Sequence, residues 1–335
     1  MPSQGEPSAN PMIELSGVTK TYPGGTQAVK ELDLAVQQGE IVCLVGPSGC
    51  GKSTTLKMIN RLIEPTSGTI RVNGVDVSKA DAVQLRRGIG YVIQHVGLFP
   101  HQRILANVMS VPRLLGVPKS VAASRAEELL AQVGLDPADF ATRYPHQLSG
   151  GQQQRVGLAR ALAADPPVLL MDEPFGAVDP LVRVHLQDFF LGLQKTLHKT
   201  VVMVTHDIDE AVKMGDRVAV FNAHGELAQF AKPATLLALP SDDFVADFVG
   251  RARGLRRLAV TAINPERLLP VDTIAVSQLG AAVDHKASLE DVLALMMRED
   301  QPMVGVTDGP KFIGVLTPDS VHAMLRADIH DDLAE

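Results

Sequence analysis

With 335 residues, 45% of them hydrophobic, the sequence is long enough for two domains and a substantial core. Its formal net charge of −7 argues against a nucleic-acid partner, and no run approaches the roughly 18 apolar residues that cross a bilayer. The only cysteines, Cys43 and Cys50, lie in an expected core strand and in a glycine-rich loop, which excludes a disulfide framework and fits a reducing cytosol.

The chain begins with a polar, proline-containing segment, residues 1–11, which lacks the apolar core of a signal peptide and is expected to be a disordered lead-in. Strands are predicted over 12–20 and 28–36, separated by the turn Pro23-Gly24-Gly25. Tyr22 precedes that turn. It either stacks on an adenine ring or simply packs against its neighbours.

A phosphate-binding loop lies between a predicted buried strand, Ile41-Val42-Cys43-Leu44-Val45, and a predicted helix over 54–62. It has the pattern G-x-x-x-x-G-K-S and consists of Gly46, Pro47, Ser48, Gly49, Cys50, Gly51, Lys52, Ser53 and Thr54. The glycines let backbone N–H groups approach a polyphosphate, and the following helix adds its positive end. Lys52 should reach the β- and γ-phosphates, and Ser53 should hold Mg²⁺. The alternative is a glycine-rich turn with an accidental lysine.

The next predicted strand, over 88–94, ends in Gln94, which is either a simple strand end or a residue facing Mg²⁺ and the attacking water. The segment from His95 to Pro100 is rich in large apolar side chains and suggests a contact surface for a partner. Residues 104–144 follow a helical pattern, which we interpret as a helical insertion within the domain.

A second possible anion site begins the helix predicted from Ser149 to Ala164. Ser149 suits an N-cap, and the glycines after it expose the helix N-terminus. The motif residues are Leu148, Ser149, Gly150, Gly151 and Gln152. This is either a plain capped helix or a phosphate site that serves the nucleotide of a neighbouring molecule.

Two further strands end in polar residues. Val168-Leu169-Leu170-Met171 leads into Asp172 and Glu173, which suit a water-mediated Mg²⁺ ligand and a residue that polarises the attacking water. The strand over 200–205 ends at His206, where ligands bind in parallel sheets. A solvated strand end and a structural histidine are the alternatives. Strands over 217–221 and 226–230 and a helical stretch over 233–249 complete the domain.

The tail begins with a basic cluster, Arg251, Arg253, Arg256 and Arg257, in a predicted linker over 251–280. This cluster either belongs to a solvated linker with a few surface ion pairs or is attracted to anionic lipid headgroups. Helices over 289–297 and 319–325 and strands over 303–306 and 312–316 predict a small α/β domain within 281–330.

Residues 12–250 resemble the ATPase subunit of an ABC transporter because six features occur in that family's order. Tyr22 matches the adenine-stacking aromatic, the glycine-rich loop the Walker A motif, and Gln94 the Q-loop glutamine. Residues 148–152 match the ABC signature, residues 168–173 the Walker B strand with its catalytic glutamate, and His206 the switch histidine. The loop 175–179 departs from the family pattern. The implied fold is a P-loop NTPase core with an antiparallel β subdomain and a helical subdomain.

Two stretches, Cys50 to Leu62 and Tyr91 to His101, resemble the osmoprotectant importers of glycine betaine, proline betaine, carnitine or choline. The ATPases of that group often end in CBS domains, and Ser288 to Ala327 resembles one CBS unit. Its residues Gly314 to Asp319 carry the likeness. Many CBS units place a ribose-binding acid where this sequence has Ser320, so a structural or dimerising tail is as well supported as nucleotide binding.

The resemblance implies ATP and Mg²⁺ as cofactors and catalysis by Glu173, His206 and Gln94, with Ser53, Gln94 and Asp172 around the metal. It implies a homodimer in the ATP-bound state, membrane-spanning permease subunits, an extracytoplasmic solute-binding protein, and a peripheral location on the cytoplasmic face of the membrane. The alternatives are the ATPase of a methionine or other amino-acid importer, a soluble non-transport ABC ATPase, and a nucleotide sensor with a degenerate ATPase.

Overall fold

The computed structural model describes residues 11–94, 97–176, 178–250, 252–270 and 281–332, so residues 1–10 of the expected lead-in, His95, Ala177 and Arg251 lie outside it. The chain divides into two compact units, residues 1–207 with 214–228 and residues 208–213 with 229–335. The boundary falls inside strand β10 (Leu227–Ala231). Among the described residues, no helix combines the length and apolar character that crossing a membrane requires.

The first unit contains an antiparallel sheet with the strand order β2-β1-β4-β5. Its strands are β1 (Ile13–Thr21), β2 (Gln27–Val36), β4 (Ser67–Val72) and β5 (Val75–Asp76). Along β2, buried and less buried residues alternate, because one face of the sheet covers the core. The predicted strands over 12–20 and 28–36 are confirmed to within a residue at each end.

A second sheet has the order β10-β9-β3-β8-β7-β6, and its strands from β9 to β6 pair in parallel. They are β3 (Ile41–Val45), β6 (Ile89–Val92), β7 (Val168–Asp172), β8 (Thr200–Val204) and β9 (Arg217–Phe221). All residues of β3, β7 and β8 are buried, as expected for central parallel strands covered on both faces. The predicted strand over 88–94 is shorter, because the backbone leaves the ladder after Val92.

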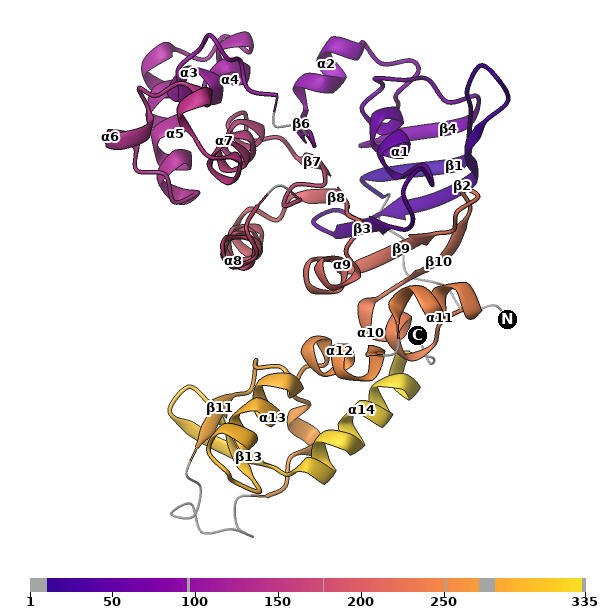
Figure 1. Cartoon of the computed structure of the whole chain (residues 1–335), viewed down its shortest axis with the longest axis vertical. Helices are drawn as coiled ribbons and strands as arrows, with labels where there is room; N and C mark the ends of the chain where they lie inside the picture. Colours follow the sequence, from indigo (N-terminus) through magenta and orange to yellow (C-terminus); the bar gives the residue numbers. More distant parts are fainter. Residues whose placement is uncertain (1–10, 95–96, 177, 251, 271–280, 333–335) are drawn as a thin grey trace, which may run out of the picture. The chain divides into compact units, whose positions relative to one another are not determined.

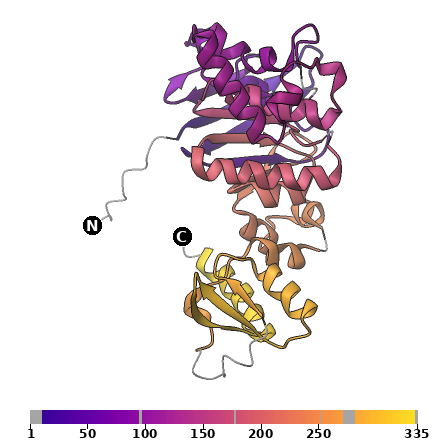
Figure 2. The ribbon, with the colours of Figure 1, turned by 90° about the vertical axis from the view of Figure 1, so that its left-hand side faces the viewer.

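Three of the described helices of this unit closely follow a strand, and five other described helical segments form a separate helical group. After β3 comes α1 (Lys52–Ile59), after β5 comes α2 (Ala82–Arg87), and after β7 comes α8 (Pro180–Leu197), the long helix at the front of this unit in Figure 2. Figure 1 shows the helical group beside α7 (Gly150–Leu162), away from α1. It consists of α3 (Ile104–Val108), α4 (Ser110–Leu114), α5 (Lys119–Gln132), α6 (Pro137–Phe140) and η1 (Pro145–Gln147).

The second unit includes α9 (Ile208–Met214), α10 (Pro233–Ala238) and α11 (Asp243–Val249). The helical stretch predicted over 233–249 is two helices. The cause is Pro240, which disfavours a helical conformation in the residue before it; Leu239 accordingly has φ −131° and ψ 69°.

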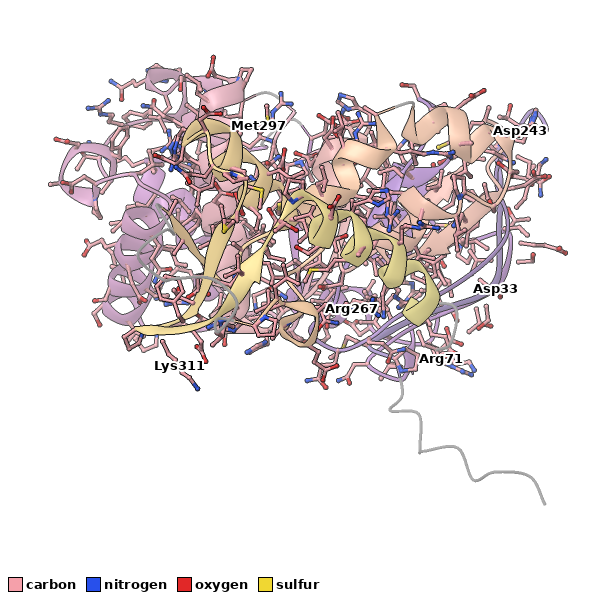
Figure 3. The ribbon with its side chains drawn as sticks, turned by 90° about the horizontal axis from the view of Figure 1, so that it is seen from below. Asp33, Arg71, Asp243, Arg267, Met297 and Lys311 are labelled. Atoms are coloured by element: carbon pink, nitrogen blue, oxygen red, sulfur yellow. The ribbon has the colours of Figure 1, made fainter. Side chains whose placement is uncertain are left out.

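The C-terminal part has the order β11-α13-β12-β13-α14, preceded by α12 (Arg253–Val260) and η2 (Pro265–Arg267). Its elements are β11 (Ala282–Asp284), α13 (Leu289–Arg298), β12 (Val304–Asp308), β13 (Lys311–Leu316) and α14 (Pro318–Asp332). Strand β12 pairs in parallel with β11 and antiparallel with β13. Met297, labelled in Figure 3, is an exposed residue in the last turn of α13.

The predicted linker over 251–280 is helical at its start, because α12 supplies part of a core. Leu258 and Ile263 are buried in the same apolar cluster as Leu289, Val304 and Leu316. The basic cluster predicted a linker, but the apolar residues around these arginines pack against residues much later in the chain. Residues 271–280 lie outside the described part.

Candidate functional site

The phosphate-binding loop is shaped by two glycines with positive φ. Gly46 has φ 147° and Gly51 has φ 94°. A Cβ atom at Gly46 would lie 2.3 Å from the carbonyl oxygen of Phe221, and one at Gly51 would lie 2.2 Å from that of Ala28. Only glycine tolerates both the conformation and the close approach. The chain can therefore turn from β3 into α1 with its N–H groups at the helix start, as an anion site requires.

Lys52 lies inside this loop with only 6% of its surface exposed. Its Nζ donates hydrogen bonds to the carbonyl oxygens of Gly46, at 2.7 Å, and Pro47, at 2.8 Å. The loop thus holds a positive charge in place. A phosphate here would meet this ammonium group together with the end of α1.

Ser53 and Asp172 join the loop to the end of strand β7. Ser53 Oγ donates a hydrogen bond of 2.7 Å to Asp172 Oδ1. A hydroxyl and a carboxylate are the hard oxygen ligands that Mg²⁺ prefers, with phosphate oxygens and water completing its shell. The donor set therefore fits Mg²⁺, as the sequence predicted for these two residues.

Burial raises the pKa of Asp172, while the hydrogen bond from Ser53 acts in the opposite direction. The pKa of the nearby Tyr91 is raised to about 12, mainly by burial and to a smaller extent by the negative charge of Asp172. The Tyr91 phenol therefore stays neutral at physiological pH.

Because the pKa of Asp172 is raised, a proton should compete with Mg²⁺ at a pH where an ordinary carboxyl group is still ionised. We expect the Mg²⁺ concentration for half-maximal ATP hydrolysis to rise as the pH falls, and this rise should begin at a higher pH than an ordinary aspartate would give. Protonation of a group with a raised folded-state pKa does not itself unfold the chain, so melting curves serve as the control. A pH-independent Mg²⁺ requirement would contradict this role.

Glu173 and His206 meet at the ends of β7 and β8. His206 Nδ1 lies 3.4 Å from Glu173 Oε2. Glu173 has φ 47°, an uncommon conformation for a non-glycine residue that costs on the order of 1 kcal/mol. Its backbone is fixed because its N–H donates to Val204 O and its carbonyl accepts from Gly176 N and Gln154 Nε2. The two side chains predicted for catalysis are thus brought together.

Tyr22 lies beside the end of the phosphate loop. Its hydroxyl is 3.4 Å from Thr54 Oγ1, and Lys20 Nζ is 5.4 Å from the ring centroid. The side chain is 37% exposed, which leaves ring surface available for a base. Its predicted stacking on an adenine ring stays a prediction.

The structure does not bring Gln94 into the site. Gln94 is exposed in a turn two residues beyond β6, and among the described residues its side chain makes no hydrogen bond. Its predicted contact with Mg²⁺ and water stays a prediction. The segment after it is only partly described, from Gly97 onward.

The signature residues stand at the start of α7, a helix that lies on the other side of the strands from α1 in Figure 1. Ser149 caps α7 by accepting from Gln152 N, and Gln152 Oε1 accepts from Ser149 N in return. Leu148 is buried, whereas Ser149 and Gly150 are exposed. No hydrogen bond or ion pair joins these residues to the phosphate loop within the described chain, and their predicted contact with the nucleotide of a second copy stays a prediction.

Sequence reasoning missed two buried amides. Gln154 reaches from α7 to the Glu173 carbonyl, at 3.2 Å. Asn107 is fully buried and bonds to the backbone of Phe99, Gln102 and Arg103, which fixes the loop in front of the helical group. A polar residue on the inward face of a helix was the available signal in both cases.

Fold and site together define an ATP-binding protein of the phosphate-loop class. The ABC transporter family model matches residues 29–176. The choline transport ATP-binding protein OpuBA of Bacillus subtilis (strain 168) is 46% identical over 300 residues, covering 89% of this chain and 78% of that protein. The osmoprotectant import ATP-binding protein OsmV of Salmonella typhimurium is 55% identical over 255 residues, covering 75% of this chain and 66% of that protein, just under two thirds.

Among solved structures, the ATP-binding cassette MJ0796 in a dimeric post-hydrolysis state with ADP and Pi matches with a TM-score of 0.61 and 38% identity, covering 66% of this chain and 99% of that one. The chain therefore belongs to the ABC transporter family, as an ATP-binding subunit that hydrolyses ATP. This confirms the predicted resemblance and the predicted fold of the ATPase core.

Proposed function

We propose that this chain powers the uptake of quaternary-ammonium osmoprotectants such as glycine betaine, proline betaine, carnitine or choline. The observation that carries the ATPase part is the pairing of Ser53 with Asp172 and of Glu173 with His206 around the end of the phosphate loop. The substrate class rests on the similarity to relatives whose names specify choline and osmoprotectant import. An amino-acid importer such as one for methionine is the second candidate.

In this proposal ATP lies on the phosphate loop, with Tyr22 against its base and Lys52 at its phosphates. Ser53 and Asp172 would hold Mg²⁺, which would supply neutralisation of the phosphate charge. Glu173 orients and polarises the attacking water, and His206 contacts the γ-phosphate. Catalysis is then chiefly positioning and charge stabilisation. The exposed Ser149 and Gly150 complete the site on a second copy, so the ATP-bound state is a homodimer.

The membrane-spanning partner is proposed to dock in a groove of about 1010 Å³ beside the helical group. Large apolar side chains form its walls, including Ile93, Phe99, Met109 and Leu114. Among the described residues its lining holds no carboxylate and six cations: Arg86, Arg87, Arg103, Arg113, Lys119 and Arg160. This composition suits an apolar permease segment that carries acidic residues. The chain would lie on the cytoplasmic face of the membrane, and a solute-binding protein would act outside.

Leu114 tests this docking site because it lines the groove and is 69% exposed. We expect Leu114→Ser to lower solute uptake and co-purification of the permease at least about tenfold, since a large apolar anchor is lost. ATP hydrolysis by the isolated chain should not change. Val121→Ser is the matched control, because Val121 is 56% exposed but lies outside the lining. Equal effects of the two variants would contradict the assignment.

The substrate class is tested in the protein's own cells. Removal of the gene should abolish ATP-dependent uptake of labelled glycine betaine, choline or carnitine, and the wild-type gene should restore it while Glu173→Gln should not. Loss of methionine uptake with intact betaine, choline and carnitine uptake would favour the second candidate.

The C-terminal region 281–330 is proposed to be a CBS-like regulatory or dimerising domain. The Ser320 hydroxyl accepts a hydrogen bond from Thr317 N at 2.6 Å and donates one to Thr317 O at 2.9 Å. Ser320 therefore serves as a local link at the start of α14, where many CBS units have a ribose-binding acid. This supports a structural role over nucleotide binding.

A further inference from the structure

His206 stands at a junction between the two units of the chain. The residue before it, Thr205, is buried and donates from its N–H to the Leu44 carbonyl in β3. The residue after it is Asp207, whose Oδ2 lies 3.8 Å from Nη1 of Arg183 on α8. The first unit therefore holds His206 from the side of the ATP site.

On its other side, the chain enters α9, whose residues 208–213 belong to the second unit. Arg256 on α12 contacts Asp209 with two nitrogen atoms: Nε with Oδ1, and Nη2 with Oδ2 at 3.1 Å. The third guanidinium nitrogen, Nη1, donates to the Val249 carbonyl at the end of α11. A single exposed ion pair contributes little, but a two-point guanidinium contact fixes orientation as well as distance.

The position of Arg256 is in turn set by the C-terminal domain. The neighbouring Arg257 donates to the carbonyl oxygen of Leu325 on α14. Leu258 is buried in the apolar core with Val292 and Val321. Helix α12 is thus a rigid part of that domain, and Arg256 is the side chain that it presents to α9.

We propose that Arg256 is a positioning residue for His206, acting through Asp209 and the first turn of α9. Only two residues separate His206 from Asp209, so a displacement of the helix start moves the histidine. A misplacement of about 1 Å is enough to slow a reaction strongly when catalysis depends on positioning. The C-terminal domain thereby has a direct route to the ATPase site. This inference rests on the proposed role of His206 in hydrolysis.

The test measures ATP hydrolysis by the full-length chain with Mg²⁺. Arg256→Ala should lower kcat about fivefold, while KM for ATP and the melting temperature stay unchanged, because the phosphate loop and the core are not touched. Arg253→Ala is the matched control: Arg253 lies one turn earlier on α12, is exposed, and makes no side-chain hydrogen bond or ion pair within the described residues. It should behave like the wild type.

A charge exchange distinguishes positioning from general stability. Asp209→Arg and Arg256→Asp should each lower kcat, and the double variant should regain at least about half of the wild-type kcat through the reversed pair. Equal kcat for Arg256→Ala and Arg253→Ala, or a double variant as slow as the single ones, would overturn the proposal. His206→Ala in the same assay distinguishes a failure of the proposed role of His206 in hydrolysis from a failure of its positioning by Arg256. Full activity of that variant would refute the role of His206 itself.

Discussion

Glu173→Gln is expected to lower ATP turnover about 10²- to 10³-fold, because an amide cannot accept the proton of the attacking water. The substitution keeps the shape of the side chain. The backbone hydrogen bonds of Glu173 to Val204 and Gln154 do not depend on its carboxylate, so the unusual φ of 47° should persist. ATP affinity should stay at the wild-type level, since Lys52 and Ser53 are unaffected.

The same variant should accumulate as an ATP-bound dimer, because dimer separation follows hydrolysis in the proposed cycle. Size-exclusion chromatography with and without ATP and Mg²⁺ measures this. Glu128→Gln is the matched control: Glu128 is an exposed glutamate on α5 that pairs with Arg125. Turnover by Glu173→Gln within tenfold of the wild type would mean that another group activates the water.

The ATP site could be predicted from the sequence because each of its parts is short and local. The strand Ile41–Val45, the loop and the helix after it are contiguous, and their geometry is imposed by Gly46 and Gly51. The meeting of Ser53 with Asp172 follows from a general property of parallel sheets, whose strands end at one edge. The same rule accounts for the approach of Glu173 to His206, because they follow the paired parallel strands β7 and β8.

The parts that escaped prediction depend on partners far away in the chain. The segment from Arg253 to Val260 was expected to be part of a linker because of its basic cluster, and the core that receives Leu258 is built largely from residues 289–324. Gln154 and Asn107 bind backbone carbonyls whose positions no local pattern specifies. The end of β6 at Val92 was also missed, because sequence patterns define strand ends poorly, and the role of Gln94 beyond that end stays a prediction.

Mixing two inactive variants should restore activity if each ATP is held between two chains. Lys52→Ala removes the charge inside the phosphate loop, and Ser149→Asp places a negative charge at the signature, facing the phosphates bound by the partner. Each should lower turnover at least about 100-fold alone. Aspartate caps a helix as well as serine, so Ser149→Asp leaves α7 intact. Ser288→Asp, the same change at the cap of α13, is the control and should have no effect.

In an equimolar mixture, half of the dimers contain one chain of each kind. In such a dimer both lesions fall in one ATP site, and the other site combines an intact loop with an intact signature. If the sites act independently, the mixture should regain about a quarter of the wild-type turnover. A mixture as inactive as either variant would contradict a site shared between chains. Separately, an active monomer in dilute solution would show that one copy contains the complete site, although no hydrogen bond or ion pair joins its loop to its own signature among the described residues.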